Sequence, residues 1–124
     1  SVDIPVYALP EPDGESVRFD MAMTSRITRP PILENAKNAF GMFNCGEAMS
    51  PRLNHGDFLF CDPDEEPRLH DICCLVLQRG DREVAIVREY LGDAMFMKLV
   101  DKTEESFEKV LKSVAPVLSI NLAR

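Results

Sequence analysis

The chain has 124 residues, a length typical of one domain, and 45% of them are hydrophobic while 28% are charged. Its 14 basic and 21 acidic side chains give a formal net charge of −7, which argues against direct binding of this chain to nucleic acid. The sequence contains neither an apolar run of the roughly 20 residues that span a bilayer nor a signal peptide. We therefore expect a cytoplasmic protein with no membrane partner.

Frequent turn signals separate short apolar runs, and this pattern predicts a mostly β domain. In chain order we expect strands over residues 4–8, 39–45, 58–61, 71–77, 83–91, 94–100 and 115–122. We expect an exposed loop over 9–16, a loop or partial turn over 21–29, and helical turns over 32–38 and 47–53. A short helix is predicted over 104–113, because Phe107, Val110, Leu111 and Val114 have helical spacing. The runs between 71 and 100 predict an antiparallel meander, with a hairpin turn at 79–81.

Residue types that bind metals are present but lack the spacing of a metal site. The four cysteines are Cys45, Cys61, Cys73 and Cys74, and no C-x-x-C motif occurs. We interpret them as small buried hydrophobic side chains in a reducing compartment. The acidic loop 62–66 is interpreted as a solvated turn, and His55 and His70 as turn residues. We expect no metal and no other cofactor.

The most informative segment is FNCGEAMSPRLNHGDFLFCDP, residues 43–63. It resembles the signature of the LexA-type Ser–Lys self-cleaving peptidases, a family that includes phage repressors. The matching positions, in the family's order, are Gly46, Met49, Pro51, Leu53, Gly56, Asp57, Leu59 and Asp62. Weaker similarity extends to IPVYA at 4–8, to 29–40, to 68–77, to VAIVREYL at 84–91 and to the final run from 114. The resemblance implies that residues 1–124 form a single LexA-like or signal-peptidase-like domain, a curled antiparallel β structure with a short helical segment.

The resemblance also identifies the positions where the family keeps its catalytic groups. A Ser hydroxyl attacks the family's own chain and a neutral Lys accepts its proton. Ala48 stands at the Ser position and has no nucleophilic atom, whereas Arg88 stands at the Lys position and stays protonated. Ser50 is no substitute nucleophile, because a residue two positions further on points elsewhere. The loop 8–16 also lacks the family's Ala-Gly or Cys-Gly cleavage bond, so we predict a pseudo-peptidase.

The remaining motif residues are expected to have structural roles. Gly46 and Gly56 permit tight turns, Asp57 accepts hydrogen bonds from backbone amides, and Met49 and Leu53 fill the core, with Pro51 in the same turn. Glu47 replaces the family's Asp before the nucleophile. It is a candidate ion-pair partner for Arg88, the alternative being a weak ion pair on the surface.

The resemblance favours a dimerisation and regulatory domain of a LexA-like or phage-type transcriptional repressor that has lost self-cleavage. DNA would then be read by a separate N-terminal helix-turn-helix domain, and this chain would hold two subunits at neighbouring half-sites. The family's last strand helps to form the homodimer, which singles out Val117, Leu118, Ile120 and Leu122. That strand is expected to be exposed and terminal, unless it is an internal strand of the sheet.

Two other interpretations remain open at this stage. In one, the natural protein is an active self-cleaving peptidase, and Ala48 is a deliberate replacement of its Ser. In the other, the degenerate cleft is a sensing module that binds an antagonist protein or peptide.

Overall fold

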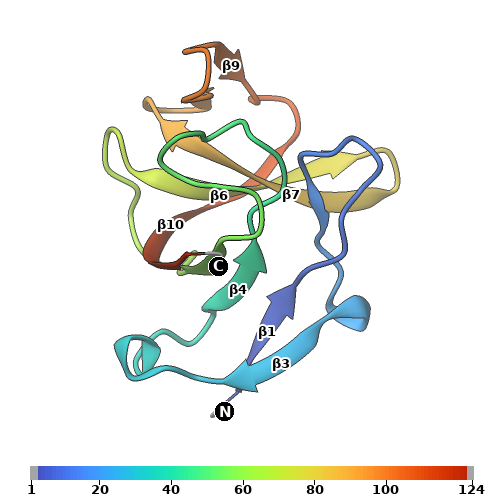
Figure 1. Ribbon diagram of the computed structural model, residues 1–124, viewed down its shortest axis with the longest axis vertical. Helices are drawn as coiled ribbons and strands as arrows, with labels where there is room; N and C mark the ends of the chain where they lie inside the picture. The colour runs from blue at the N-terminus through green and yellow to red at the C-terminus, as the bar shows by residue number, and fades with distance from the viewer. Residues whose placement is uncertain (1–2, 123–124) are drawn as a thin grey trace.

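The computed structural model describes residues 3–122, which form a curled, mostly β structure (Figure 1). The strands are β1 (Asp3–Tyr7), β2 (Val17–Arg18), β3 (Ser25–Thr28), β4 (Phe40–Phe43), β5 (Phe58–Cys61), β6 (Ile72–Arg79), β7 (Arg82–Tyr90), β8 (Met95–Met97), β9 (Glu104–Ser106) and β10 (Leu111–Asn121). Two 3-10 helices, η1 (Met21–Met23) and η2 (Pro31–Leu33), complete the described elements. The described sheet has the order β3-β1-β4-β5-β10-β6-β7-β8-β9, with β2 paired to β7. The prediction of a mostly β fold is therefore confirmed.

The hairpin of β6 and β7 lies next to β10 in the sheet. Its two strands are antiparallel from Ile72 opposite Glu89 to Arg79 opposite Arg82. The turn contains two residues and begins with Gly80 at φ 62°, a conformation that glycine adopts at little cost. The first six residues of β6 are apolar because both faces of the strand are covered there: Cys74 belongs to one core cluster and Leu75 to another.

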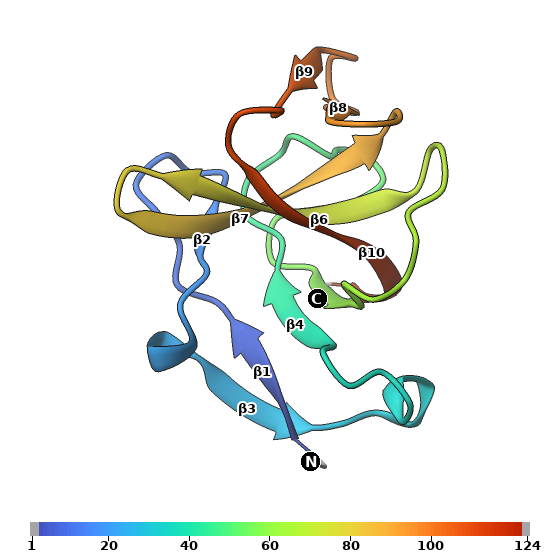
Figure 2. The ribbon, with the colours of Figure 1, turned by 180° about the vertical axis from the view of Figure 1, so that it is seen from behind.

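Strand β10 joins the two halves of the sheet. Residues 111–116 pair with β6, and residues 117–121 pair with β5, with a register shift between Val117 and Ser119. Figure 2 shows β10 running beside β6 before the chain ends near β4. The expected terminal strand exists, but it lies between two other strands of the sheet. The structure therefore agrees with the alternative of an internal strand: the bulge lets β10 pair with β6 up to Pro116 and with β5 from Val117, and among the described strands none pairs with the other side of residues 117–121.

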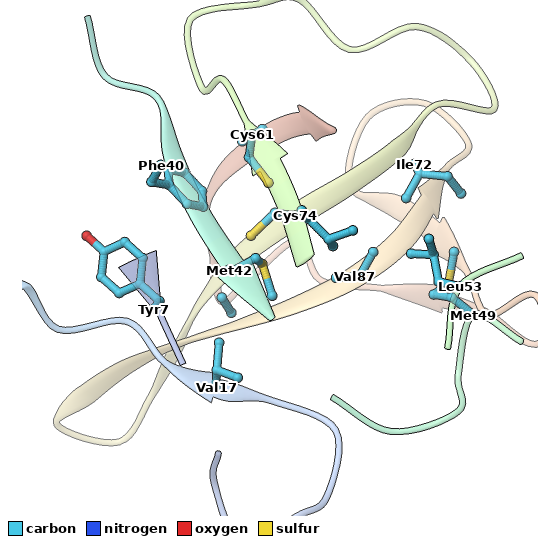
Figure 3. Packing of buried hydrophobic residues seen from close by; sticks show 13 residues of the cluster. Tyr7, Val17, Phe40, Met42, Met49, Leu53, Cys61, Ile72, Cys74 and Val87 are labelled. Carbon is cyan, nitrogen blue, oxygen red and sulfur yellow. The ribbon is translucent and has the colours of Figure 1, made fainter. Parts of the chain in front are cut away.

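The main core cluster lies between the β6–β7 hairpin and strands β1, β2, β4 and β5. Its buried residues are Tyr7, Val17, Phe40, Met42, Met49, Leu53, Leu59, Cys61, Ile72, Cys74, Ala85, Val87 and Ala115. Figure 3 shows Met49 and Leu53 entering this cluster beside Val87 and Ile72, from a loop rather than from a strand. The loop that contains the sequence motif is therefore held in place by the main core.

Two predicted segments differ from the structure. Residues 104–113 are not helical: β9 pairs with β8, and a turn leads from Phe107 to β10. Their helical spacing arises because Phe107, Leu111 and Val114 all pack on the cluster around Phe96, although they lie on a turn and a strand. Residues 25–28 form a strand rather than a loop, and β1 also pairs with β4 in parallel, so the sheet is mixed.

Candidate functional site

The sequence motif forms a closed loop between β4 and β5. Its ends are tied at Asn44, whose amide donates to the Asp57 carbonyl at 2.8 Å and whose carbonyl accepts from the Gly56 amide at 2.8 Å. The buried Asp57 carboxylate accepts from the Asn54 amide at 2.7 Å, as its place in the motif predicts. Met49 and Leu53 are fully buried in the main core, which confirms their expected packing role. The exposed Pro51 follows Ser50 through a cis peptide bond.

Gly46 lies against the chain's own upstream loop. Its φ is +82°, and a Cβ atom at this position would lie 2.5 Å from the Gly14 carbonyl oxygen. The Gly46 amide donates to Nδ1 of His55 at 2.9 Å. His55 is therefore a turn residue, as the sequence predicts. Only glycine allows the positive φ and the close approach together.

The upstream loop is ordered by hydrogen bonds within itself. The Asp13 carboxylate accepts from the Glu15 and Ser16 amides at 3.0 Å each and from the Ser16 hydroxyl at 2.7 Å. Partial burial acts to raise the pKa of Asp13, but these hydrogen bonds and one from Arg79 outweigh it and lower the pKa to about 2. The loop is therefore held in one conformation by hydrogen bonds to the ionised Asp13. This conformation places Gly14 and Glu15 beside Gly46.

Arg88 is the charged side chain at the centre of the site. It is 1% exposed, and its Nε donates to the Glu105 carboxylate at 2.7 Å. One terminal nitrogen donates to the Glu15 carboxylate at 3.1 Å and the other to the Val87 carbonyl at 2.9 Å. Arg88 on β7 therefore binds the upstream loop and β9 at the same time.

Two expectations about Arg88 need correction. Glu47, the proposed ion-pair partner, is exposed, and the partners are Glu15 and Glu105 instead. The alternative of a surface ion pair is also wrong, because the guanidinium is buried among these groups. The reason is topological: β9 and the loop 11–16 converge on β7, whereas the Glu47 side chain projects from the motif loop into solvent.

Ala48 is held through its backbone. Its carbonyl accepts from the amide of Val100 at 3.0 Å, so the segment that follows β8 passes beside the motif loop. Its side chain is a methyl group, and Arg88 is bound as a permanent cation by two carboxylates. The described groups at these two positions offer neither an attacking oxygen nor a proton acceptor.

The other titratable candidates are structural. Cys61, Cys73 and Cys74 are buried, and burial raises the pKa of the Cys73 thiol to about 12, with a contribution from the charge of Asp71. His70 is exposed and lies 2.9 Å from the Glu89 carboxylate. Within residues 3–122, no cluster of three or more His, Cys, Asp and Glu side chains is arranged to hold a metal ion.

The predicted dimer strand exposes only part of its apolar side. Val117 and Ile120 pack against the main core, whereas Leu118 is 37% and Leu122 is 68% exposed. The register shift between 117 and 119 turns Leu118 outward. Of the four predicted dimer residues, Leu118 and Leu122 are therefore the two that are exposed to solvent.

Comparison with known proteins gives one relative. No family model matches the chain. Over 85 residues it is 36% identical to "Repressor protein C" of Rhizobium phage 16-3. The chain is similar to a phage repressor. The aligned region covers 64% of the chain but only 32% of the repressor, so the chain spans about a third of that protein's length. No helix among the described residues is both long enough and apolar enough to cross a membrane.

Proposed function

We propose that this chain is a regulatory domain of a phage-type transcriptional repressor, that it pairs two subunits, and that it does not cleave itself. The observation that carries the proposal is Arg88, which is buried and forms ion pairs with Glu105 and with Glu15, a residue of the loop that lies against Gly46, while Ala48 stands at the nucleophile position of the motif. The similarity to "Repressor protein C" supports the regulatory role, and the motif from Gly46 to Asp57 supports a relationship to LexA-type domains.

The loss of self-cleavage is argued from the charge at position 88. A general base must give up its proton near neutral pH, and a guanidinium keeps its proton at any accessible pH. Arg88 also forms ion pairs with two carboxylates, those of Glu15 and Glu105. The same carboxylates already occupy the guanidinium, which disfavours the alternative in which an antagonist's carboxylate binds there.

Restoring the nucleophile alone is expected to leave the protein intact. The Ala48→Ser variant supplies a hydroxyl, but Arg88 still cannot accept its proton, so incubation at alkaline pH should give a single band by mass spectrometry and gel electrophoresis. The Arg88→Lys and Ala48→Ser/Arg88→Lys variants serve as comparisons. Appearance of a small N-terminal fragment and a large C-terminal fragment from Ala48→Ser would revive the interpretation as an active peptidase.

Subunit pairing is argued from the free side of β10. Within residues 3–122, Val117–Asn121 pair with β5, and the ladder to β6 ends at Pro116. A second copy of the strand can add to the other side of this half by antiparallel pairing around a twofold axis. Leu118 and Leu122 would supply apolar contacts there. In this proposal DNA is contacted by another part of the full-length protein, which agrees with the charge of −7.

A charge at Leu118 is expected to separate the subunits. Leu118 and Val110 are both 37% exposed, so Leu118→Asp and Val110→Asp place the same charge at equally exposed apolar positions. Sedimentation analysis should show a dimer for the unmodified chain and for Val110→Asp, and a monomer for Leu118→Asp. The reason is that burying an unpaired carboxylate in an interface costs on the order of 3 kcal/mol. A chain that is monomeric at high concentration would refute the pairing role.

A further inference from the structure

A pocket of about 390 Å³ lies at the other end of the molecule from β9, beside β1 and β3. Three aromatic residues line it. The rings of Tyr7 and Phe19 are stacked with centroids 4.1 Å apart, and the ring of Phe40 meets them edge-on at 5.6 and 5.3 Å. The pocket volume falls at the small end of the range for sites that bind small molecules, and an aromatic wall suits an apolar ligand body.

The charge around this pocket is opposite to that of the whole chain. Arg26, Arg29 and Lys37 line it together with one acidic residue, Asp3, so the charged lining residues sum to about +2 by formal charge, whereas the chain carries −7. Arg26 lies close enough to Tyr7 for its charge to act on the phenol, and one of its nitrogens donates to the Asp3 carbonyl at 3.1 Å. A ligand that fits this electrostatic environment is an anion.

A buried hydrogen-bond donor faces the same pocket. Tyr7 is 3% exposed, and its hydroxyl donates to the Met21 sulfur at 2.8 Å. A thioether is a weak acceptor, and Met21 is 62% exposed on the short helix η1, so a stronger acceptor can replace it. Figure 3 shows the Tyr7 hydroxyl at the outer end of its ring, directed away from Met42 and Val87 in the core. Burial and nearby charges raise the pKa of Tyr7, which keeps the phenol a donor at neutral pH.

We propose that this pocket binds a small free organic acid with an apolar body, such as an aromatic or alkyl carboxylate. The body would lie on the rings of Phe19 and Phe40, and the carboxylate would accept hydrogen bonds from the Tyr7 hydroxyl and Arg26 in place of Met21. The proposal is independent of the repressor function, because it rests on the shape, charge and hydrogen bonding of the pocket.

The test is calorimetric titration of the 124-residue chain with naphthoate and with its neutral analogue naphthamide. We expect saturable one-to-one binding of naphthoate, and binding of naphthamide that is roughly tenfold weaker. Tyr7→Phe removes only the hydroxyl, and Arg26→Gln removes the guanidinium with its charge, including the donor to the Asp3 carbonyl. Each should weaken naphthoate binding by roughly fivefold to tenfold.

The control variant is Arg68→Gln, which removes the charge of an exposed arginine that does not line the pocket. It should bind naphthoate as tightly as the unmodified chain, and thermal unfolding should show that all three variants are folded. The proposal fails if naphthoate does not saturate, if naphthamide binds equally well, or if Arg68→Gln weakens binding as much as Arg26→Gln. It also fails if inorganic phosphate displaces naphthoate at equal concentration, because the site would then recognise any anion.

Discussion

The Arg88→Met variant is expected to lose about 3 kcal/mol of unfolding free energy. Methionine keeps most of the apolar stem of the side chain but removes the hydrogen bonds to Glu15 and Glu105. Two partly buried carboxylates, 33% and 26% exposed, are then left facing one another without a cation. Urea denaturation followed by circular dichroism measures the loss.

A matched control lies on the same strand. Arg82 also forms an ion pair with a glutamate, at 3.4 Å from Glu11, but its side chain is 48% exposed. Arg82→Met should therefore cost less than about 1 kcal/mol. Adding Glu15→Gln and Glu105→Gln to Arg88→Met should recover part of the loss, because the repulsion between the two carboxylates disappears. Equal losses for the two methionine variants would contradict the central role assigned to Arg88.

The Gly46→Ala variant is expected to release the upstream loop and to destabilise the protein by about 3 kcal/mol. Roughly 1–2 kcal/mol comes from the positive φ, and the rest from the 2.5 Å approach of the new methyl group to the Gly14 carbonyl oxygen. Because that oxygen is backbone, the loop 11–16 must move away. Cleavage after Glu15 by a glutamate-specific protease should then become faster, which mass spectrometry can follow over time.

Gly80 provides the control for backbone strain alone. Its φ is +62°, and no atom lies within 4 Å of the position that a Cβ would occupy. Gly80→Ala should therefore cost only about 1–2 kcal/mol and leave cleavage after Glu15 unchanged. If both alanine variants showed the same stability and the same cleavage rate, the contact between Gly46 and the upstream loop would have no energetic weight.

The motif loop could be predicted from the sequence because its structure is local. The spacing of Gly46, Met49, Leu53, Gly56 and Asp57 is enough to expect two tight-turn residues, two core residues and one carboxylate that accepts from a backbone amide. The hydrogen bonds from Gly46 to His55 and from Asn54 to Asp57 stay within the motif, whereas the contact of Gly46 with Gly14 joins distant parts of the chain. The alternating and continuous apolar runs likewise predicted most strands, since burial of one or both faces imposes those patterns.

The partners of Arg88 could not be predicted, because they are set by topology. Among the 21 acidic residues, Glu47 was the expected partner because it precedes Ala48 in the motif. The folded chain instead brings Glu15 and Glu105 to Arg88 from separate elements. A buried arginine requires carboxylates, but the sequence does not say which ones. The helix expected over 104–113 failed for a similar reason: Phe107 in a turn and Leu111 and Val114 on β10 pack on the cluster around Phe96, and this shared packing gives them a helix-like spacing.

The position of β10 has a consequence for biosynthesis. Among residues 3–122, β10 alone joins β5 to β6 in the sheet, and it follows all the other described strands in the sequence. While the ribosome still holds this segment in its exit tunnel, the hydrogen-bonding groups of β5 that face β10 have no partner and the two halves of the sheet cannot join. The nascent protein therefore completes this sheet only after β10 has left the tunnel, and long-range pairing of this kind makes that step slow.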